Sequence, residues 1–273
     1  MTPDYNAYKK SSFGPAFLFL DKKRRGALAV YYAFCRLMDD LADEPGIENR
    51  LQQLAFWREE IAHVFEKKAT TALGKELEKV VADFALTPDR FLWLIEGMEA
   101  DVQGRRYLSF ADLEWYLWRV AGIVGLATLD ILGIKGSKAK ALAYALGSAV
   151  QTTNIIRDIH EDAALGRVYI PQILLEEFHL TAENILTNTP PEQIAKMLSA
   201  MALQSRVYYA QADAIMNTLP ARKMLPCRVM GLVYGKNLAK IEKKGFLFTK
   251  TIKLSKSEKI IYGLCALLKA PIF

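Results

Sequence analysis

Apolar residues recur at helical spacing along almost the whole chain. Between residues 47 and 66, for example, they stand three or four positions apart, at Leu51, Leu54, Trp57, Ile61 and Phe65, which places them on one face of a helix. No segment alternates apolar and polar residues as a half-buried strand does, and no Asn-Gly hairpin turn is present. The pattern therefore predicts an all-α fold.

Cap and turn residues divide this pattern into roughly ten helices. Asp21 can cap a helix that ends near Asp43, and Ser109 can cap one that runs toward Leu132. Other helices are expected over 47–66, 73–84, 87–102, 138–162, 189–216, 222–244 and 256–268. Because no linker is long enough to divide the chain and 273 residues can bury a large core, we expect a single all-α domain over residues 1–273.

Two acidic segments follow apolar helical runs and carry most of the functional information. The first box, residues 32–44, holds Asp39, Asp40 and Asp43, and the second box, residues 151–162, holds Asp158 and Asp162. Positions four apart share one face of a helix. Within each box, the carboxylates at that spacing are therefore expected to point the same way.

Carboxylates that face a core repel one another and lose hydration, which is costly unless a cation neutralises them. Oxygen ligands suit Mg²⁺, which binds through a few carboxylates together with substrate phosphates. Arg36 and Arg157 precede the acids of the first and second box, and a guanidinium group forms paired hydrogen bonds with phosphate. Gln151 and Asn154 extend the polar face of the second box. Together the boxes predict a magnesium–diphosphate site between two helices.

The charge and the missing motifs exclude several classes of protein. The net charge is +6, and basic residues cluster at 22–25 and 236–259. Such clusters are typical of a solvated surface, of attraction to an anionic substrate, or of contact with anionic lipid. Nucleic acid is not an expected partner, because no nucleic-acid-binding motif accompanies the charge. The sequence contains no Gly-x-Gly-x-x-Gly, Walker or Gly-x-Ser-x-Gly motif, which argues against a nucleotide-binding Rossmann domain and an α/β-hydrolase.

The chain ends and the cysteines bear on location. The first ten residues are polar, so no signal peptide is expected and the cytoplasm is the predicted location. Three cysteines make an odd count without metal-ligand spacing, which is typical of reduced core thiols. The apolar tail 260–273 is interrupted by Lys269 and Pro271. It predicts a docking helix or, as the alternative, a peripheral contact with a membrane surface.

The motifs of the two boxes resemble those of the squalene/phytoene synthase family of head-to-head prenyl transferases. The resemblance rests on segments in the same order: Tyr32-x-x-x-Arg36-x-x-Asp39-Asp40-x-x-Asp43-Glu44, then Arg119-Val-Ala-Gly122-x-Val-Gly125, then Gln151-x-x-Asn154-x-x-Arg157-Asp158-x-x-Glu161-Asp162, followed by Gly166-Arg167-x-Tyr169-x-Pro171. It extends from Ser11 to Lys256. The chain looks most like bacterial members of hopanoid and carotenoid clusters, especially those of the presqualene diphosphate synthase type.

This resemblance implies an isoprenoid synthase fold, in which helices surround a central apolar cavity and Mg²⁺ bridges the two boxes. By position, the implied metal ligands are Asp39, Asp40, Asp43, Asp158 and Asp162. Tyr32 and Tyr116 match tyrosines that lie near the reacting carbons. The implied substrate-binding residues are Ser12, Arg36, Gln151, Asn154, Arg157 and Tyr234.

The sequence departs from the family pattern in two places. Lys250 and Lys253 stand in the C-terminal flap, where many relatives have an arginine, and a lysine binds phosphate as a point charge rather than as a fork. Trp118 stands where a tyrosine is common. The diphosphate contacts at the flap are therefore expected to differ from those of relatives.

The implied reaction joins two C15 farnesyl diphosphates into presqualene diphosphate, and it can continue to squalene with NADPH as the hydride donor. Two alternatives stay open. One is a phytoene or dehydrosqualene synthase of carotenoid biosynthesis, and the other, from a different class, is a non-catalytic helical assembly factor of the same fold. The sequence does not choose between C15 and C20 substrates or between oligomeric states.

Overall fold

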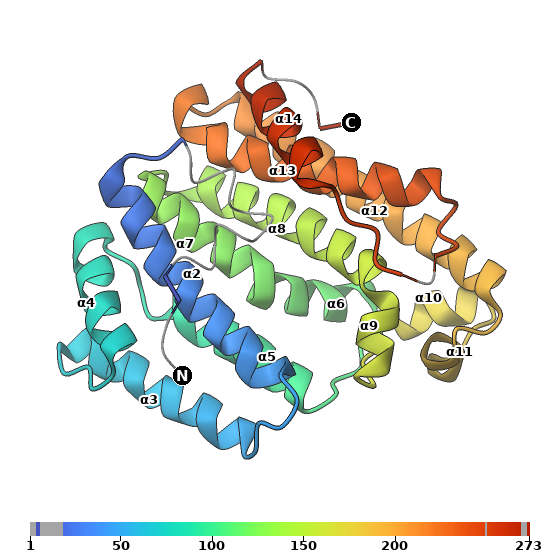
Figure 1. The fold of residues 1–273 in the computed structure, drawn as a ribbon, viewed down its shortest axis with the longest axis horizontal. Coiled ribbons are helices and arrows are strands. Elements are labelled where there is room, and N and C mark those ends of the chain that lie inside the picture. The colour runs from blue at the N-terminus through green and yellow to red at the C-terminus, as the bar shows by residue number, and fades with distance from the viewer. Residues whose placement is uncertain (1–3, 6–18, 249, 269–271) are drawn as a thin grey trace.

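The computed structural model describes residues 4–5, 19–248, 250–268 and 272–273, and every regular element in these ranges is helical (Figure 1). The elements are α2 (Lys22–Asp43), α3 (Arg50–Glu66), α4 (Ala72–Phe84), α5 (Asp89–Val102), α6 (Phe110–Leu117), the π-helical turn η2 (Trp118–Gly122), α7 (Ile123–Leu132), α8 (Ser137–Arg157), α9 (Ile159–Ala164), α10 (Gln172–Glu177), α11 (Ala182–Thr187), α12 (Pro191–Asn217), α13 (Ala221–Lys243) and α14 (Lys256–Leu267). The expected all-α class is confirmed. Helices α10 and α11 were not predicted, because six residues are too few to display an apolar period.

Helix α8 lies at the centre of the molecule, where it packs against η2, α7, α12 and α13 (Figure 1). Helix α2 packs against α4, α5 and α7, and its Phe34 and Met38 are completely buried. In Figure 1, α2 and α8 both run from the left of the view toward the right. Their C-terminal ends, which carry the two boxes, therefore lie toward the same side of the molecule.

The first acidic helix has the predicted limits. The Asp21 carboxylate accepts a hydrogen bond from the backbone N–H of Arg24 at 2.9 Å, which caps α2, and the helix ends at Asp43. In the same way, Ser109 Oγ caps α6 by accepting from the backbone N–H of Asp112 at 3.2 Å. Both caps satisfy backbone donors that the first turn of a helix leaves unpaired.

The helix predicted from Ser109 toward Leu132 contains the π-helical turn η2 between α6 and α7. Gly122 fits against the ring of Trp118, since a Cβ at this position would come within 2.4 Å of a ring carbon. Gly147 of α8 approaches the same turn, and its Cβ would lie 2.7 Å from the backbone nitrogen of Gly122. Two glycines thus allow η2 and α8 to meet at backbone contact.

The second acidic helix is interrupted, so the prediction of one helix over 138–162 was wrong. Helix α8 ends at Arg157, and Asp158 adopts φ −102° and ψ 14° before α9 begins. Helix α9 then turns away from the axis of α8 (Figure 1), although the N–H of Asp162 still donates to the carbonyl of Asp158 at 2.8 Å. Asp158 therefore stands at a corner between two helices.

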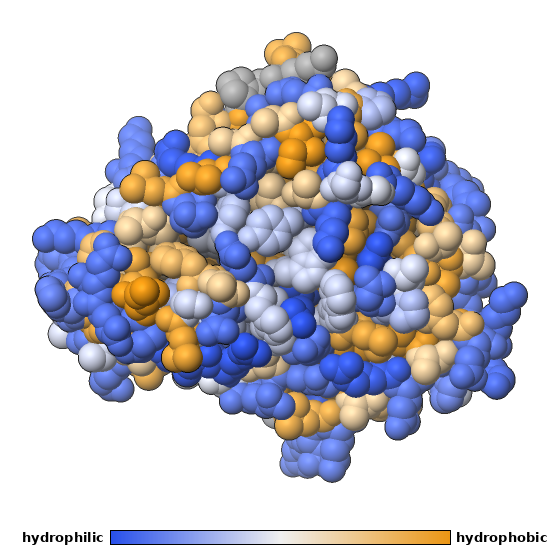
Figure 2. Space-filling model, turned by 180° about the vertical axis from the view of Figure 1, so that it is seen from behind, coloured by the Kyte–Doolittle hydropathy of each residue, from blue (hydrophilic) through white to orange (hydrophobic). Residues whose placement is uncertain are grey.

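Judged by length and composition alone, one stretch of the described residues, Phe110–Leu132, could cross a membrane. Its most apolar window is 56% buried inside the fold, and Leu117, Ile123 and Ala127 are almost completely buried. Packing against α8 explains this apolarity. Seen from behind, the surface carries separate hydrophobic patches divided by hydrophilic side chains (Figure 2), as is usual for a folded protein.

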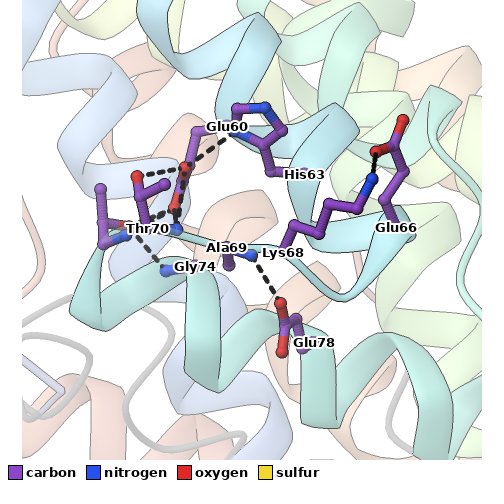
Figure 3. A network of polar contacts seen from close by, with 9 residues as sticks. Glu60, His63, Glu66, Lys68, Ala69, Thr70, Gly74 and Glu78 are labelled. Atoms are coloured by element: carbon purple, nitrogen blue, oxygen red, sulfur yellow. Dashed lines mark hydrogen bonds and ion pairs between the residues drawn. The ribbon is translucent and has the colours of Figure 1, made fainter.

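A buried carboxylate, Glu60, joins α3 to the start of α4 (Figure 3). It accepts hydrogen bonds from the backbone N–H groups of Thr70 and Thr71 at 2.9 and 2.7 Å, and from their hydroxyls at 2.7 and 2.8 Å. Thr71 in turn caps α4 by accepting from the N–H of Gly74 at 2.9 Å. Burial by itself would raise the pKa of Glu60, but the hydrogen bonds from Thr71 and Thr70 outweigh it and leave that pKa lowered.

Replacing Glu60 with glutamine should destabilise the protein, because an amide N–H₂ would face the donors of Thr70 and Thr71. We expect the free energy of unfolding in urea at pH 7 to fall by about 2–3 kcal/mol. Since the pKa of Glu60 is lowered in the folded protein, its contribution exists above the unfolded pKa and disappears as the pH falls through the folded value. The difference between the two proteins should therefore shrink in acid.

The matched control is Glu59→Gln, which changes the exposed neighbouring carboxylate. Its unfolding free energy should differ from that of the original protein by less than about 0.5 kcal/mol. Equal effects of the two substitutions would contradict the role assigned to Glu60.

Candidate active site

A cavity of about 150 Å³ lies between α2, η2, α7, α8 and α13. Its lining on α8 runs from Leu142 to Asn154, which is about 18 Å of helix at 1.5 Å per residue. Leu142 and Leu146 make the early part of this lining apolar, whereas Gln151 and Asn154 make its end polar. Tyr32 of α2 also lines the cavity. An apolar slot with one polar end suits a ligand with a hydrocarbon chain and a polar head.

The two boxes meet near the polar end of this cavity. Arg167, which follows α9, connects them: its Nη1 lies 2.5 Å from a carboxylate oxygen of Asp43, and its Nη2 donates to the carbonyl of Ala42 at 3.1 Å. Loss of hydration and the negative charge of Asp158 raise the pKa of Asp162 to about 8, and Asp43 of the first box adds to this shift. The charge of the first box therefore affects the pKa of an acid in the second.

The first box is also crowded with negative charge. Loss of hydration and the charge of Asp43 raise the pKa of Asp39 to about 7. Because 51% of the Asp39 side chain is exposed, water screens part of this repulsion, and Asp162 is the better example of a destabilised carboxylate. Burial raises the pKa of Asp40 as well, although Nη2 of Arg36 lies 2.6 Å from its carboxylate.

Each predicted arginine pairs with an acid of its own box. Arg36 contacts Asp40, and Arg157 Nε donates to Asp158 Oδ1 at 2.7 Å while its Nη2 contacts the second oxygen. Among the described residues, no three Asp, Glu, His or Cys side chains converge closely enough to hold a metal ion by themselves. A metal ion at the boxes would therefore need additional oxygen ligands from a substrate or from water.

The donor atoms of the boxes fit Mg²⁺, because all of them are oxygens. Asn154 adds a specific indication. Its side-chain nitrogen donates to Gln151 at 3.1 Å, whereas its Oδ1 is buried and accepts no hydrogen bond from the described part of the chain. A buried acceptor without a donor costs free energy, and a nearby cation would remove that cost.

Asp101 of α5, which lies outside both boxes, belongs to the same cluster. It is buried, and it accepts hydrogen bonds from the hydroxyls of Tyr116 at 2.9 Å and Tyr169 at 2.8 Å. The rings of these tyrosines stack with their centroids 4.9 Å apart. Loss of hydration raises the pKa of Asp101 to about 6, against the opposing charge of Arg167. Sequence reasoning selected Tyr116 but missed Asp101, because only the fold brings the two tyrosines to it.

A second, smaller pocket of about 10 Å³ opens beside Arg157. It is lined by Tyr234 of α13, by Lys253 of the flap (here residues 250–255) and by Lys259 of α14. Burial, together with the charges of Arg157 and Lys253, lowers the pKa of Lys259. Three cations therefore surround a space about as large as a water molecule, and their combined charge favours an anionic group beside them. Lys259 was not selected from the sequence, because nothing near it in the chain marks it as more than a surface lysine.

Five of the residues selected from the sequence line these two pockets. Tyr32, Gln151 and Asn154 line the cavity, and Tyr234 and Arg157 line the smaller pocket. Ser12 lies outside the described residues.

A family model described as squalene/phytoene synthase matches residues 7–258, which is nearly the whole chain. The chain belongs to the squalene/phytoene synthase family. A presqualene diphosphate synthase of Rhodopseudomonas palustris is 33% identical to it, over 92% of this chain and 90% of the relative. The chloroplastic phytoene synthase 1 of Solanum lycopersicum is 32% identical, over 92% of this chain and 63% of the relative.

Solved structures agree with this membership. A squalene synthase from Alicyclobacillus acidocaldarius superposes with a TM-score of 0.82 at 28% identity, over 89% of this chain and 91% of that chain. A dehydrosqualene synthase in complex with a ligand superposes with a TM-score of 0.85 over 97% and 94%, and at 24% identity this likeness concerns the fold alone. The expected isoprenoid synthase fold is therefore confirmed.

Squalene/phytoene synthases are prenyltransferases that use prenyl diphosphates. The chain is accordingly an enzyme that condenses two prenyl diphosphates head to head, which confirms the reaction class expected from the sequence. The roles of individual site residues stay predictions.

In buffer without metal ions, the contribution of Asp162 to stability should be lost as the pH rises from about 4 to about 8. The pKa of Asp162, about 8 in the folded protein, lies above the usual aspartate value of about 3.9. The folded state therefore binds the proton more tightly than the unfolded state, and stability falls as the pH rises through this window.

Thermal unfolding with a chelator present tests this expectation. Asp162→Asn should raise the Tm at pH 8 and flatten its pH dependence, whereas the control Asp83→Asn, at an exposed carboxylate of α4, should keep the original slope. An unchanged slope in Asp162→Asn would show that the carboxyl is not destabilised.

Lys259 should contribute to diphosphate binding. Removing one charge from a partly buried cation cluster costs about 1.5 kcal/mol of binding, so Lys259→Ala should bind inorganic diphosphate roughly tenfold more weakly in calorimetry with Mg²⁺ present. Lys256→Ala is the matched control, because Lys256 lies on the same helix but is exposed. Equal affinities of the two variants would remove Lys259 from the site.

Proposed function

We propose that the protein converts two farnesyl diphosphates, each with a C15 chain, into presqualene diphosphate. The observation that carries this proposal is the meeting of the two boxes near the polar end of an apolar cavity. The choice of product is supported by relatives from Rhodopseudomonas palustris, Sinorhizobium fredii and Zymomonas mobilis, which are 33%, 35% and 34% identical and are named presqualene diphosphate synthases.

In this proposal the cations of the site bind the diphosphate groups. Arg36 and Arg157 exchange their carboxylate partners for diphosphate oxygens, and Lys259 adds a charge from α14. The residues that would hold Mg²⁺ are Asp39, Asp40, Asp43, Asp158 and Asp162, with Asn154 assisting. When bound, Mg²⁺ supplies Lewis-acid stabilisation of the charge that develops on the departing diphosphate.

The reaction then follows from the chemistry of the substrates. The C1–O bond of one farnesyl group breaks, diphosphate leaves with the electron pair, and an allylic cation remains. The C2–C3 double bond of the second chain attacks this C1, and loss of one proton closes the cyclopropane ring. Apolar walls such as Leu146 and Val150 keep water away from the cation.

The proton has two acceptors in this proposal. One is the released diphosphate. The other is a tyrosine hydroxyl, Tyr32 or Tyr116, and Tyr116 can pass its own proton to Asp101, to which it already donates. The raised pKa of Asp101, about 6, makes its carboxylate a better proton acceptor than an ordinary aspartate.

A second ionisation in the same site would extend the reaction. Hydride transfer from NADPH would give squalene, whereas loss of a proton would give a product of the dehydrosqualene or phytoene type. Phytoene synthesis is the second candidate function, and it is supported by the phytoene synthases of Solanum lycopersicum and Arabidopsis thaliana, which are both 32% identical.

We further propose a cytoplasmic location with peripheral contact to a membrane. A farnesyl diphosphate is an amphiphile, and the joined product carries two hydrocarbon chains. Both partition toward a bilayer, so an enzyme that exchanges them with a membrane surface gains access to its substrate and an outlet for its product.

Product analysis tests the proposed function. The purified protein is incubated with Mg²⁺ and either C15 or C20 diphosphate, with and without NADPH, and the products are identified by mass. We expect presqualene diphosphate from the C15 substrate without NADPH. A C40 product from the C20 substrate, with none from C15, would establish phytoene synthesis instead.

Asp158→Ala provides the site-specific arm of this experiment. Its product formation should fall by orders of magnitude while its circular dichroism stays helical, because the second box loses the carboxylate at its corner. Asp83→Ala, at an exposed acid, should retain full activity. Near-normal activity of Asp158→Ala would contradict the assignment of the boxes.

A further inference from the structure

Helix α14 presents a continuous apolar face to solvent. Five large apolar side chains on it or at its C-cap are 50–83% exposed, namely Ile260, Ile261, Leu264, Leu267 and Leu268. Their spacing of one, three and four positions places them along one side of a helix. Isolated exposed apolar residues are ordinary, whereas a contiguous group marks an interaction surface.

The packing of α14 fixes which face is exposed. Gly263 and Ala266 are buried on its inner side, and the helix packs against α13. The chain is anchored at both ends of the helix, because Leu254 before it is 7% exposed and Ile272 after it is 4% exposed. Ile272 occupies the space beside Gly235 of α13, where a Cβ would come within 2.4 Å of it. The apolar face is thus held outward by the fold.

Positive charge is concentrated at the N-terminal end of this helix and in the segments that precede it. Residues 236–259 contain eight lysines and two glutamates, a net charge of +6 that equals that of the whole chain. Both glutamates are already paired, Glu242 with Arg206 and Glu258 with Lys240. The exposed lysines are Lys243, Lys244, Lys250, Lys253 and Lys256. A partner that covers this region must therefore offer both apolar material and negative charge.

We propose that α14 docks on the surface of a bilayer that contains anionic lipid. Its apolar face enters the boundary between headgroups and acyl chains, and the neighbouring lysines bind lipid phosphates. This inference rests on the proposed function, which supplies a membrane-partitioning substrate and product. The docking helix is also part of the site, since its Lys259 lines the pocket beside Arg157.

A second copy of the chain is the other partner that could cover this apolar face. Juxtaposing two surfaces of net charge +6 would place like charges together, which disfavours association. Anionic lipid attracts these lysines, whereas a second copy would repel them. The charge of the region therefore favours the bilayer over a dimer.

Vesicle flotation of the full chain tests the proposal. The protein should bind vesicles of phosphatidylcholine that contain one quarter phosphatidylglycerol, should not bind pure phosphatidylcholine, and should dissociate as salt is raised. Leu264→Asp should weaken binding by about tenfold or more. The control Ile173→Asp, on α10, should bind as the original protein does, although both positions are equally exposed at 56%. Lys256→Ala should weaken binding by about fivefold.

Three results would overturn the proposal. The first is no binding to the anionic vesicles, and the second is unchanged binding by Leu264→Asp. The third is a dimer in sedimentation that Leu264→Asp converts to a monomer without any vesicle binding. Activity on detergent-dispersed C15 diphosphate, measured without vesicles, separates this proposal from the proposed function: product formation with failed flotation would reject docking alone, and flotation without product would reject the function alone.

Discussion

Repulsion among carboxylates in a small, poorly hydrated space is the constraint on which the rest of this structure depends. Loss of hydration, together with the charge of Asp158 and a smaller contribution from Asp43 of the first box, raises the pKa of Asp162. The first box also stands at the C-terminal end of α2, where the helix dipole adds negative potential. Stability alone would not select this arrangement, whereas binding a cation and a polyanionic substrate would.

Three arginines offset this negative charge. Arg36 and Arg157 each contact an acid of their own box, and Arg167 ties Asp43 to the chain that follows the second box. All three guanidinium groups can form paired bonds with phosphate as well as with carboxylate. The same cations therefore offset the charge of the acids and are available to the diphosphate, so that in the proposed function substrate binding exchanges partners within a preformed cluster.

The hydrocarbon part of the site depends on close helix packing. Gly122 and Gly147 bring η2 and α8 to backbone contact, and the cavity lies beside this contact, between α2, α8 and α13. Helix α14, which packs against α13, brings Lys259 to the small pocket at Arg157 while its other face stays apolar and exposed. A single short helix thus connects the diphosphate end of the site to the surface that we assign to the membrane.

The sequence by itself determined the helical class, the caps at Asp21 and Ser109 and the two boxes, because helical periodicity, capping and i,i+4 spacing are local properties. Only the tertiary structure decided that the second acidic helix breaks at Asp158, and that Asp101 and Lys259 join the site. Asp101 receives Tyr169 from 68 positions away, and Lys259 reaches Arg157 through the fold of α14. The roles of both residues arise from burial and from charges on distant segments. Neither can be read from the residues next to them in the sequence.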